Sequence, residues 1–569
     1  MLKFDSRDTR FKQPFGAVKT EEKIQIVFPV EQTVNVTGVA LIYRGARDGK
    51  ADLHYVGTDD GYNVFRTEFS LETPGIYYYR FEIYRGGETL YAGRASDDGK
   101  AVVGEWLKEW QLTVYDADFK TADWLKGKII YHIFPDRFKR IEDGKRPLFG
   151  RFKDWSDELT IFDPDGVYRA NDFYGGNIKG IISELDYLVS LGVGAIYLSP
   201  IFESHSNHRY DTGDYMKIDP LFGTEKEFIT LVSEADKRGI GIILDGVFNH
   251  TGADSLYFNK FGNYPGVGAY QSPDSAYYDW YTFTSYPDVY DCWWGVTVVP
   301  TVKRNCSAFQ KFIAGKGGVI EKWTSMGVKG WRLDVADELS SDFIEEIRKK
   351  VKSMGDIALI GEVWEDASTK VSYGEKRKYL FGDELDGTMN YPFRTAILNL
   401  FKDRSAVSFV NSVMSIVENY PKDALYSSMS LLGTHDTVRI VTALGDEHNM
   451  RSKSERLLYR MGAEEYRIAK TKLKAASALQ YFLPGLPTVY YGDEIGMQGY
   501  EDPINRRPFA RGFEDTELLA HYRYLGQIHP EFTNDFSVFA EPGKLTLNRG
   551  QYTLKVDLND FSYKISKKK

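Results

Sequence analysis

Apolar and polar positions alternate along parts of the first 120 residues, and a period of two predicts β-strands. Ile24–Phe28 alternates in this way, and Ile76–Tyr84 is a longer, aromatic stretch of the same kind. Three further short candidates are Val34–Val36, Ala40–Tyr43 and Trp110–Tyr115. Short strands at regular spacing, separated by turn residues, are typical of an immunoglobulin-like β-sandwich. We therefore expect an N-terminal sandwich domain over residues 1–120.

After about residue 121 the pattern changes, and short apolar runs alternate with helical stretches. Helices are expected at Ile181–Leu191, Lys226–Arg238 and Ala308–Met326. Eight strand–helix units indicate an α/β fold of the (β/α)8 TIM-barrel type, over residues 121–512. The expected strands are Ile129–Phe134, Ala195–Leu198, Ile242–Asp245, Gly330–Asp334, Ala358–Glu362, Asp386–Asn390, Met429–Gly433 and Thr488–Tyr491.

Two segments do not fit the barrel rhythm. Residues 250–306 are too long for a plain connection after the third strand, and they are rich in aromatic residues and glycine. Such a long excursion is typical of a functional lid or an inserted loop subdomain. Residues 513–569 contain two alternating runs, Lys544–Leu547 and Tyr552–Leu558, which predict a small C-terminal β domain.

Composition narrows the class of protein. The chain has 72 basic and 81 acidic residues, interspersed, with a formal net charge of −9. This balance argues against nucleic-acid partners and against an anionic membrane surface. The first residues lack the basic and apolar regions of a signal peptide, and no apolar stretch approaches a membrane span of about 20 residues, so we expect a cytoplasmic protein. Cys292 and Cys306 are too few for a disulfide framework and are expected to be reduced thiols.

Carboxylates collect at the ends of the expected strands. Asp334, Glu362 and Asp436 each lie where a strand is expected to stop. The carboxyl ends of barrel strands form one mouth, so these side chains would meet there. A nucleophilic carboxylate, a carboxylic acid and a third, stabilising carboxylate are the groups that break a glycosidic bond with retention. Each acid alone is equally consistent with an exposed strand end, but their coincidence favours a glycosidase site.

Basic and imidazole side chains complete the expected site. Arg332 and Asp334 are two positions apart on a strand and therefore point the same way, so the cation would keep Asp334 ionised. A structural ion pair is the alternative for these two residues. His250 and His435 are candidate donors to sugar hydroxyls, and Asp436 could bind two hydroxyls of one ring. Isolated histidines are more often core residues, but these two also follow expected strands.

A metal site is not indicated by any strong ligand spacing. Asn249, or the loop Lys139–Gly144, could supply oxygen ligands for calcium. That loop lacks alternating aspartate and asparagine residues. We expect that no metal or other cofactor is required, with Ca²⁺ as a possible ligand.

Four of these segments resemble the conserved regions of glycoside hydrolase family 13, the α-amylase family. They are Asp245–His250 (DGVFNH), Gly330–Val335 (GWRLDV), Gly361–Trp364 (GEVW) and Gly433–Asp436 (GTHD). The resemblance runs from about Ile129 to Phe509. It implies that Asp334 is the nucleophile, Glu362 the acid/base and Asp436 the transition-state stabiliser.

Further segments resemble substrate-binding parts of that family. His208–Asp211 (HRYD) is similar to the loop whose tyrosine, here Tyr210, stacks on the sugar at the cleavage site. Asp502 and Arg506 resemble the pair that holds the next sugar. The substrate-binding residues implied are His208, Tyr210, Asp211, His250, Arg332, Trp364, His435, Asp502 and Arg506.

The segment Tyr131–Phe138 (YHIFPDRF) resembles the neopullulanase, cyclomaltodextrinase and maltogenic amylase branch, whose members carry an N-terminal β domain and often form homodimers. Three departures from the branch are Asp337, where asparagine is usual, Val299–Lys303 (VPTVK) in the inserted segment, and Glu365, where histidine is common. The resemblance implies a retaining hydrolase of α-1,4 and possible α-1,6 bonds in maltooligosaccharides, cyclodextrins, pullulan or starch. The alternatives are an α-glucan transglycosylase of the same family and an inactive glucan-binding relative.

Overall fold

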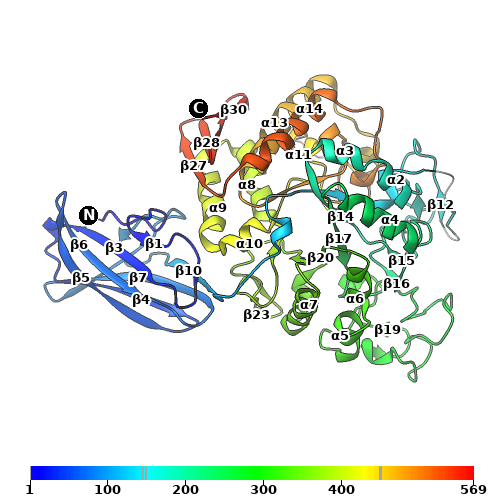
Figure 1. Ribbon diagram of the computed structural model, residues 1–569, viewed down its shortest axis with the longest axis horizontal. Helices are drawn as coiled ribbons and strands as arrows, with labels where there is room; N and C mark the ends of the chain where they lie inside the picture. Colours follow the sequence, from blue (N-terminus) through cyan, green and yellow to red (C-terminus); the bar gives the residue numbers. More distant parts are fainter. Residues whose placement is uncertain (1, 142–145, 148–149, 447–450, 569) are drawn as a thin grey trace. The chain divides into compact units, whose positions relative to one another are not determined.

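The computed structural model describes residues 2–141, 146–147, 150–446 and 451–568, and its elements are labelled in Figure 1. The chain divides into two compact units. The three domains expected from the sequence (1–120, 121–512 and 513–569) are a different division of the chain, and their boundaries stay a prediction. The first unit comprises Met1–Thr121, Trp364–Gly387 and Val407–Tyr426, and the second comprises Ala122–Val363, Thr388–Ala406 and Ser427–Lys569.

The described N-terminal residues of the first unit form a ten-stranded sheet in the order β1-β3-β6-β5-β4-β7-β10-β2, with β8 and β9 beyond β7. Strand β5 pairs with β4 through its first half and with β6 through its second half, with a register shift between Tyr55 and Gly57. Phe28 of β3 stacks on Phe81 of β7, with ring centroids 4.1 Å apart, so the strands before and after this shift enclose a common core. The strands are β1 (Lys12–Gln13), β2 (Val18–Lys19), β3 (Ile24–Glu31), β4 (Gly38–Gly45), β5 (Gly49–Asp59), β6 (Tyr62–Phe69), β7 (Gly75–Arg85), β8 (Glu88–Gly93), β9 (Val102–Val103) and β10 (Trp110–Tyr115).

An N-terminal β domain is therefore present, but one of its expected strands is not. Val34–Val36 does not form a strand; Gln32–Val34 forms a 3-10 turn instead. Asn35 takes a left-handed conformation (φ 54°, ψ 52°), and its N–H bonds to the carbonyl of Gln32. Asparagine tolerates this conformation better than most residues, which explains why the chain turns here instead of extending.

Trp110 is the centre of the core of this unit. It is 1% exposed, stacks on Tyr79 at 5.4 Å and donates from its indole nitrogen to the carbonyl of Gly99 at 3.0 Å. We expect Trp110→Ala to lower the free energy of unfolding by about 3–5 kcal/mol, because it creates a large cavity. Chemical denaturation followed by circular dichroism would measure this. Trp106→Ala is the matched control, since Trp106 is 96% exposed and should change stability by less than about 0.5 kcal/mol; equal effects would contradict the expectation.

In the described part of the second unit, eight strands form a parallel sheet in the order β24-β21-β20-β17-β14-β11-β26-β25. A parallel bridge between Met389 and Met429 nearly closes the two ends. All six residues of β14 are buried, as expected of strands covered on both sides. The expected barrel is confirmed. Its strands are β11 (Ile129–Ile133), β14 (Val193–Leu198), β17 (Gly241–Gly246), β20 (Gly330–Leu333), β21 (Ala358–Gly361), β24 (Gly387–Thr388), β25 (Met429–Leu431) and β26 (Leu486–Tyr490).

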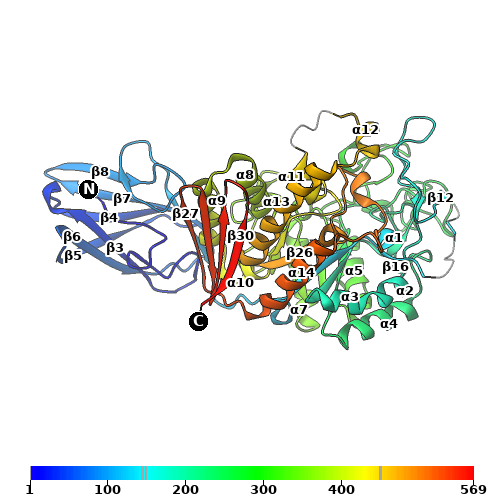
Figure 2. The same ribbon diagram turned by 90° about the horizontal axis from the view of Figure 1, so that it is seen from above.

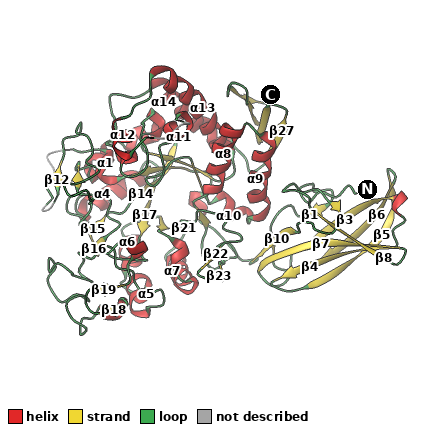
Figure 3. Cartoon of the chain, turned by 180° about the vertical axis from the view of Figure 1, so that it is seen from behind, coloured by secondary structure: helices red, strands yellow, loops and turns green. Residues whose placement is uncertain are grey.

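Helices surround these strands (Figure 3). The single helix expected at Ala308–Met326 is wrong: α5 and α6 are separate, because Gly315–Gly318 interrupts the helix and Gly317 has a φ of +70°. The helix expected at Ile181–Leu191 is likewise divided, at Glu184. The helices assigned wholly to this unit are α1 (Pro135–Phe138), α2 (Ile178–Ser183), α3 (Leu185–Ser190), α4 (Glu225–Asp236), α5 (Ser307–Ala314), α6 (Val319–Ser325), α7 (Ser341–Ser353), α8 (Tyr391–Asp403), α11 (Ile440–Gly445), α12 (Lys453–Leu458), α13 (Ala463–Phe482) and α14 (Thr516–Ile528).

The inserted segment after β17 is anchored where it leaves and rejoins the barrel. His250 bridges Thr301 and Tyr281 bridges Val302. Trp280 packs against Phe309 of α5, with ring centroids 5.0 Å apart. The segment thus packs against a helix of the barrel. Its elements are η3 (Tyr278–Trp280), β18 (Phe283–Ser285), β19 (Val289–Tyr290) and η4 (Trp293–Gly295).

The C-terminal residues form an antiparallel sheet over β27 (Phe536–Glu541), β28 (Lys544–Arg549), β29 (Tyr552–Asp557) and β30 (Tyr563–Lys567), visible in Figure 2. Alternate residues of β28 and β29 are buried. Arg549 donates to the carbonyls of Phe482 and Leu483 at the end of α13, at 3.1 and 2.9 Å, which fastens this sheet to the barrel helices. The expected C-terminal β domain is confirmed.

Candidate active site

Arg332 joins two of the three predicted acids through one guanidinium. Its side chain is completely buried in β20. Nη1 lies 2.6 Å from Asp334 Oδ1 and 2.8 Å from Asp245 Oδ1, and Nη2 lies 2.9 Å from Glu362 Oε2. Asp334 directly follows β20 and Glu362 directly follows the neighbouring strand β21. The carboxyl ends of adjacent strands therefore place both acids on the same cation.

The charges in this cluster do not balance. Burial raises the pKa of Asp334 well above its ordinary value; Arg332 opposes this, and the charges of Glu362 and Asp245 add to it. We expected Arg332 to keep Asp334 ionised, and the guanidinium does favour that form, but burial has the larger effect. One cation faces three buried carboxylates, so burial raises the pKa of Asp334 and of Asp245, and repulsion adds to the effect at Asp334.

The third acid, Asp436, lies beside His435 and Arg506. Its Oδ2 is 3.2 Å from His435 Nε2, and its Oδ1 is 3.4 Å from Arg506 Nη2. Arg506 also pairs with Asp502 at 2.9 Å and donates to the carbonyl of His435 at 2.9 Å. Burial and, next, the charge of Glu362 raise the pKa of Asp436 to about 7. Asp436 is therefore electrostatically coupled to the cluster on Arg332.

The raised pKa of Asp436 predicts how stability depends on pH. An aspartate in the unfolded chain has a pKa of about 3.9. Between pH 4 and 7 or so the folded protein holds a proton that the unfolded chain has released, so the free energy of unfolding falls as pH rises. We expect Asp436→Asn to reduce this fall, measured by urea unfolding at about pH 5 and about pH 8. An identical fall in variant and wild type would contradict the raised pKa.

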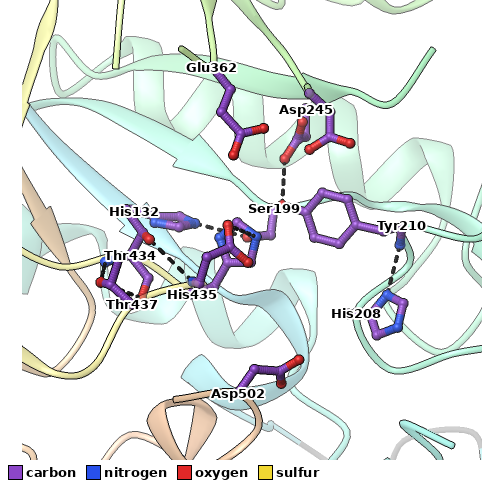
Figure 4. Close-up of polar contacts among 12 residues, drawn as sticks. His132, Ser199, His208, Tyr210, Asp245, Glu362, Thr434, His435, Thr437 and Asp502 are labelled. Atoms are coloured by element: carbon purple, nitrogen blue, oxygen red, sulfur yellow. Dashed lines mark hydrogen bonds and ion pairs between the residues drawn. The ribbon is translucent and has the colours of Figure 1, made fainter. Parts of the chain in front are cut away.

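Tyr210 and Asp245 connect the aromatic wall of the site to the acids. The Tyr210 ring stacks on His435, with centroids 5.1 Å apart and planes at 12°. Its hydroxyl donates to Asp245 Oδ2 at 2.9 Å, and the hydroxyl of Tyr197 donates to the same oxygen at 2.6 Å. Figure 4 shows Tyr210 pointing toward Asp245, with Glu362 nearby.

The loop that carries Tyr210 lies between β15 (Phe202–Ser204) and β16 (Thr212–Ile218). The backbone N–H of Tyr210 donates to His208 Nδ1 at 3.1 Å. Asp211 is buried and accepts hydrogen bonds from the hydroxyls of Ser204 (2.6 Å) and Ser206. These bonds favour a role for Asp211 in shaping the loop.

The predicted histidines are neutral: His250 and His435 are buried, and His208 is partly buried. Burial lowers the pKa of His208 to about 3 and that of His250 to about 4. It also holds the pKa of His435 and of His132 far below the ordinary value. A neutral imidazole offers one donor and one acceptor, which suits hydrogen bonding to sugar hydroxyls.

Val335 has a strained backbone directly after Asp334. Its φ and ψ of 39° and 53° lie in the left-handed region, which is unusual for a β-branched residue and costs about 1–3 kcal/mol. Its N–H donates to Glu362 Oε2 at 2.8 Å. The sharp turn after β20 thus gives Glu362 a second donor besides Arg332.

Some functional residues were not selected from the sequence. Asp245 is the last residue but one of β17, and Asp334 directly follows β20, so the strand-end pattern could have identified Asp245 as well. His132 stacks on Tyr197, with ring centroids 4.4 Å apart. It also bonds to Ser199 at 2.9 Å (Figure 4). Only the packed barrel shows these contacts. Trp364, by contrast, belongs to the first unit and is 45% exposed; its predicted role stays a prediction.

A metal centre is not visible among the described residues, in which no group of three or more histidine, cysteine or acidic side chains is placed to hold an ion. Asn249 Nδ2 donates to Glu338 Oε2 at 2.8 Å. The other expected calcium ligands, in the loop Lys139–Gly144, lie partly outside the described residues. Calcium binding stays a prediction.

The family model for the α-amylase catalytic domain matches residues 132–303 and 299–533, more than half of the chain. The chain belongs to the α-amylase family. It is 37% identical to an amylopullulanase of Thermoanaerobacterium saccharolyticum over 585 residues, which cover 93% of this chain and 44% of that protein. It is 32% identical to neopullulanase 2 of Thermoactinomyces vulgaris over 465 residues, with 79% and 70% coverage.

A solved structure is similar to this chain over almost its whole length. The type III pullulan hydrolase from Thermococcus kodakarensis has a TM-score of 0.68 and 26% identity, and the match covers 98% of this chain and 94% of that one. The expected resemblance to the neopullulanase branch is confirmed. The chain spans only 30–44% of the amylopullulanases that it matches. Among the described residues, no helix is long and apolar enough to cross a membrane.

Proposed function

We propose that this chain is a retaining α-glucan hydrolase that cleaves α-1,4 and, in some substrates, α-1,6 glucosidic bonds. The observation that carries the proposal is the contact of Asp334 and Glu362 with the two terminal nitrogens of one buried guanidinium, 2.6 and 2.9 Å away. The substrates are maltooligosaccharides, cyclodextrins, pullulan or starch. The names of the relatives, amylopullulanase and neopullulanase, support this substrate class.

The reaction follows from the positions of the acids. Asp334 attacks the anomeric carbon while Glu362 protonates the leaving oxygen, and a β-glycosyl ester forms on Asp334. Glu362, now ionised, takes a proton from water, which displaces Asp334 and restores the α-configuration. The two carboxyl groups are expected to be about 5–5.5 Å apart, as this double displacement requires. Asp436 binds hydroxyls of the reacting ring as it flattens.

The remaining residues hold the sugar. Tyr210 stacks on the sugar ring at the cleavage site. His435 fixes the plane of the tyrosine ring, and Asp245 fixes the position of its hydroxyl. The neutral imidazoles of His208, His250 and His435 bond to hydroxyls, and Asp502 and Arg506 bind the adjoining sugar. The substrate-binding role expected for Trp364 stays a prediction.

Digestion of starch, pullulan and β-cyclodextrin, with the products identified, tests the proposal. Hydrolysis raises the number of free reducing ends, whereas transfer alone leaves it level. Proton NMR during the first minutes should detect the α-anomer of the new reducing end before it mutarotates. Initial release of the β-anomer, or no cleavage of any of the three, would refute a retaining hydrolase.

Three expectations accompany the proposal. We propose that catalysis needs no cofactor, because the carboxylates supply both nucleophile and acid; unchanged activity after chelation would support this and would leave Ca²⁺ a structural role at most. A homodimer is expected from the branch that the chain resembles, and sedimentation velocity would test it. The cytoplasmic location expected from the sequence stays a prediction.

A further inference from the structure

A cavity of about 660 Å³ lies on the hairpin that carries Tyr210, apart from the acids. Its volume is within the range of about 300–1,000 Å³ that small-molecule sites occupy. Its described lining residues include none of those proposed above to bind or cleave the glucan. They include Glu203 and Ser204 of β15, Asp254 and Tyr264 of the inserted segment, and Phe173 of β13 (Asp172–Phe173).

Tyr264 gives the cavity an aromatic wall whose position is fixed. Its backbone N–H donates to the side-chain oxygen of Asn259 at 3.2 Å, and the side-chain nitrogen of Asn259 donates to the carbonyl of Tyr264 at 2.9 Å. Its hydroxyl lies against Gly213 of β16, where an added Cβ atom would come within 2.2 Å of it. Burial and, next, the charge of Glu203 raise the pKa of Tyr264, so the hydroxyl is also close to that carboxylate. The ring is therefore held in place before a ligand binds.

Hydrogen-bonding groups face the same cavity. Asp254 Oδ2 lies 3.4 Å from His205 Nδ1 and accepts from Asn263 Nδ2 at 3.0 Å, so these three side chains are held together. The side chain of His205 is 43% exposed and that of Asp254 is 11% exposed. Glu203 adds a second carboxylate to the lining. A few polar groups beside an aromatic and apolar wall are typical of a ligand site.

The remaining charges of the lining are compensated. Lys217 Nζ pairs with Asp214 at 3.2 Å, and Asp219 pairs with the buried Arg209 at 2.8 Å. Arg146 lines the cavity as a cation besides the acid Glu203. A strongly charged ligand would be desolvated here without an excess of opposite charge to compensate it. The lining therefore favours a neutral ligand rich in hydroxyl groups.

The cavity and the loop of Tyr210 share one hairpin. Ser204 lines the cavity, and its hydroxyl donates to Asp211 Oδ1 at 2.6 Å. Ser204 also pairs with Thr212 across β15 and β16. A glucan bound in the cavity would therefore lie near the acids, and another part of the same polymer could reach them at a raised effective concentration.

We propose that this cavity is a second binding site for a short maltosaccharide segment, separate from the site that cleaves the glucan. This inference rests on the proposed function. The apolar C–H face of a sugar ring packs on Tyr264, and the sugar hydroxyls bond to Glu203, His205 and Asn263. The cavity holds one part of a starch or pullulan chain while another part enters the cleavage site. It therefore contributes to the hydrolysis of polymers and not to that of short substrates.

Kinetics on a polymer and on a short substrate test this role. We expect Tyr264→Ala to lower kcat/KM for soluble starch by about 3- to 10-fold and to leave kcat/KM for an aryl α-maltoside unchanged. Tyr264→Phe keeps the ring and should retain most of the activity on starch. Phe261→Ala is the matched control, because Phe261 is 59% exposed in the same inserted segment but does not line the cavity. Its variant should match the wild type on both substrates.

Calorimetric titration with maltotriose tests the site directly. Asp334→Ala, which removes the nucleophile, should bind two maltotriose molecules, and adding Tyr264→Ala should leave one. Glu203→Ala in the same background provides a second test that keeps the aromatic ring, and it should weaken the same binding event. A Tyr264→Ala variant that binds maltotriose and cleaves starch as Phe261→Ala does would overturn the second site and leave the proposed function standing. A wild type that cleaves no α-glucan would overturn both.

Discussion

Asp334→Ala is expected to lower kcat for glucan hydrolysis by about 10⁴-fold or more, because no glycosyl ester can form. The smaller alanine side chain leaves room for azide, which can attack the anomeric carbon from the face that Asp334 attacks in the wild type. With an aryl α-maltoside, the new C–N bond forms as the C–O bond to the phenolate breaks. The product is a β-glycosyl azide, identified by NMR.

Glu362→Ala is the matched control for this experiment. Here Asp334 still forms the β-glycosyl ester from the aryl substrate, and azide displaces Asp334 from the opposite face. The product is the α-glycosyl azide. The two variants should therefore give opposite anomers. An α-azide from Asp334→Ala, or hydrolysis at the wild-type rate, would assign the nucleophile to another residue.

Arg332→Met should be the most destabilising single change in the site. It leaves Asp245, Asp334 and Glu362 buried without the cation that contacts all three. We expect the free energy of unfolding at about pH 8 to fall by about 3–5 kcal/mol. Buried carboxyls that lack a cation hold their protons to higher pH than in the unfolded chain, so the loss should shrink toward about pH 5.

Urea unfolding of Arg332→Met at these two pH values would measure the effect. Arg238→Met is a suitable control, because Arg238 is 30% exposed and pairs with Asp186 and Glu234 on the surface. That change should cost about 1 kcal/mol or less. A loss for Arg332→Met that does not vary with pH would contradict the role assigned to the cation.

The barrel could be predicted because its strands are short apolar runs with sharp ends. Ile129–Phe134 and Thr488–Tyr491 were expected where β11 and β26 lie. Strand β5 was missed, because most of its residues are exposed or intermediate and show little alternation. The helix Ala308–Met326 was overextended, because its apolar periodicity continues across a glycine-rich break.

Site residues could be predicted where the position of a residue along a strand determines the direction in which its side chain points. Arg332, Asp334 and Glu362 follow from that rule, and the structure places them in contact. The bond between Asn249 and Glu338 could not be predicted, because it joins loops from two different strands. Burial also changes pKa values in ways that the order of residues along the chain does not reveal, as for Asp334.

Asp245 links Tyr210, the proposed sugar-stacking residue, to the cation that the two proposed catalytic acids share. One of its oxygens receives the hydroxyls of Tyr197 and Tyr210, and the other contacts the guanidinium that Asp334 and Glu362 share. Removing the hydroxyl of Tyr210 would leave more negative charge on Asp245 and so draw Arg332 away from the nucleophile. A substitution at Tyr210 therefore changes substrate affinity and turnover together. Engineering of substrate preference is better directed at residues that do not contact Tyr210, Asp245 or Arg332.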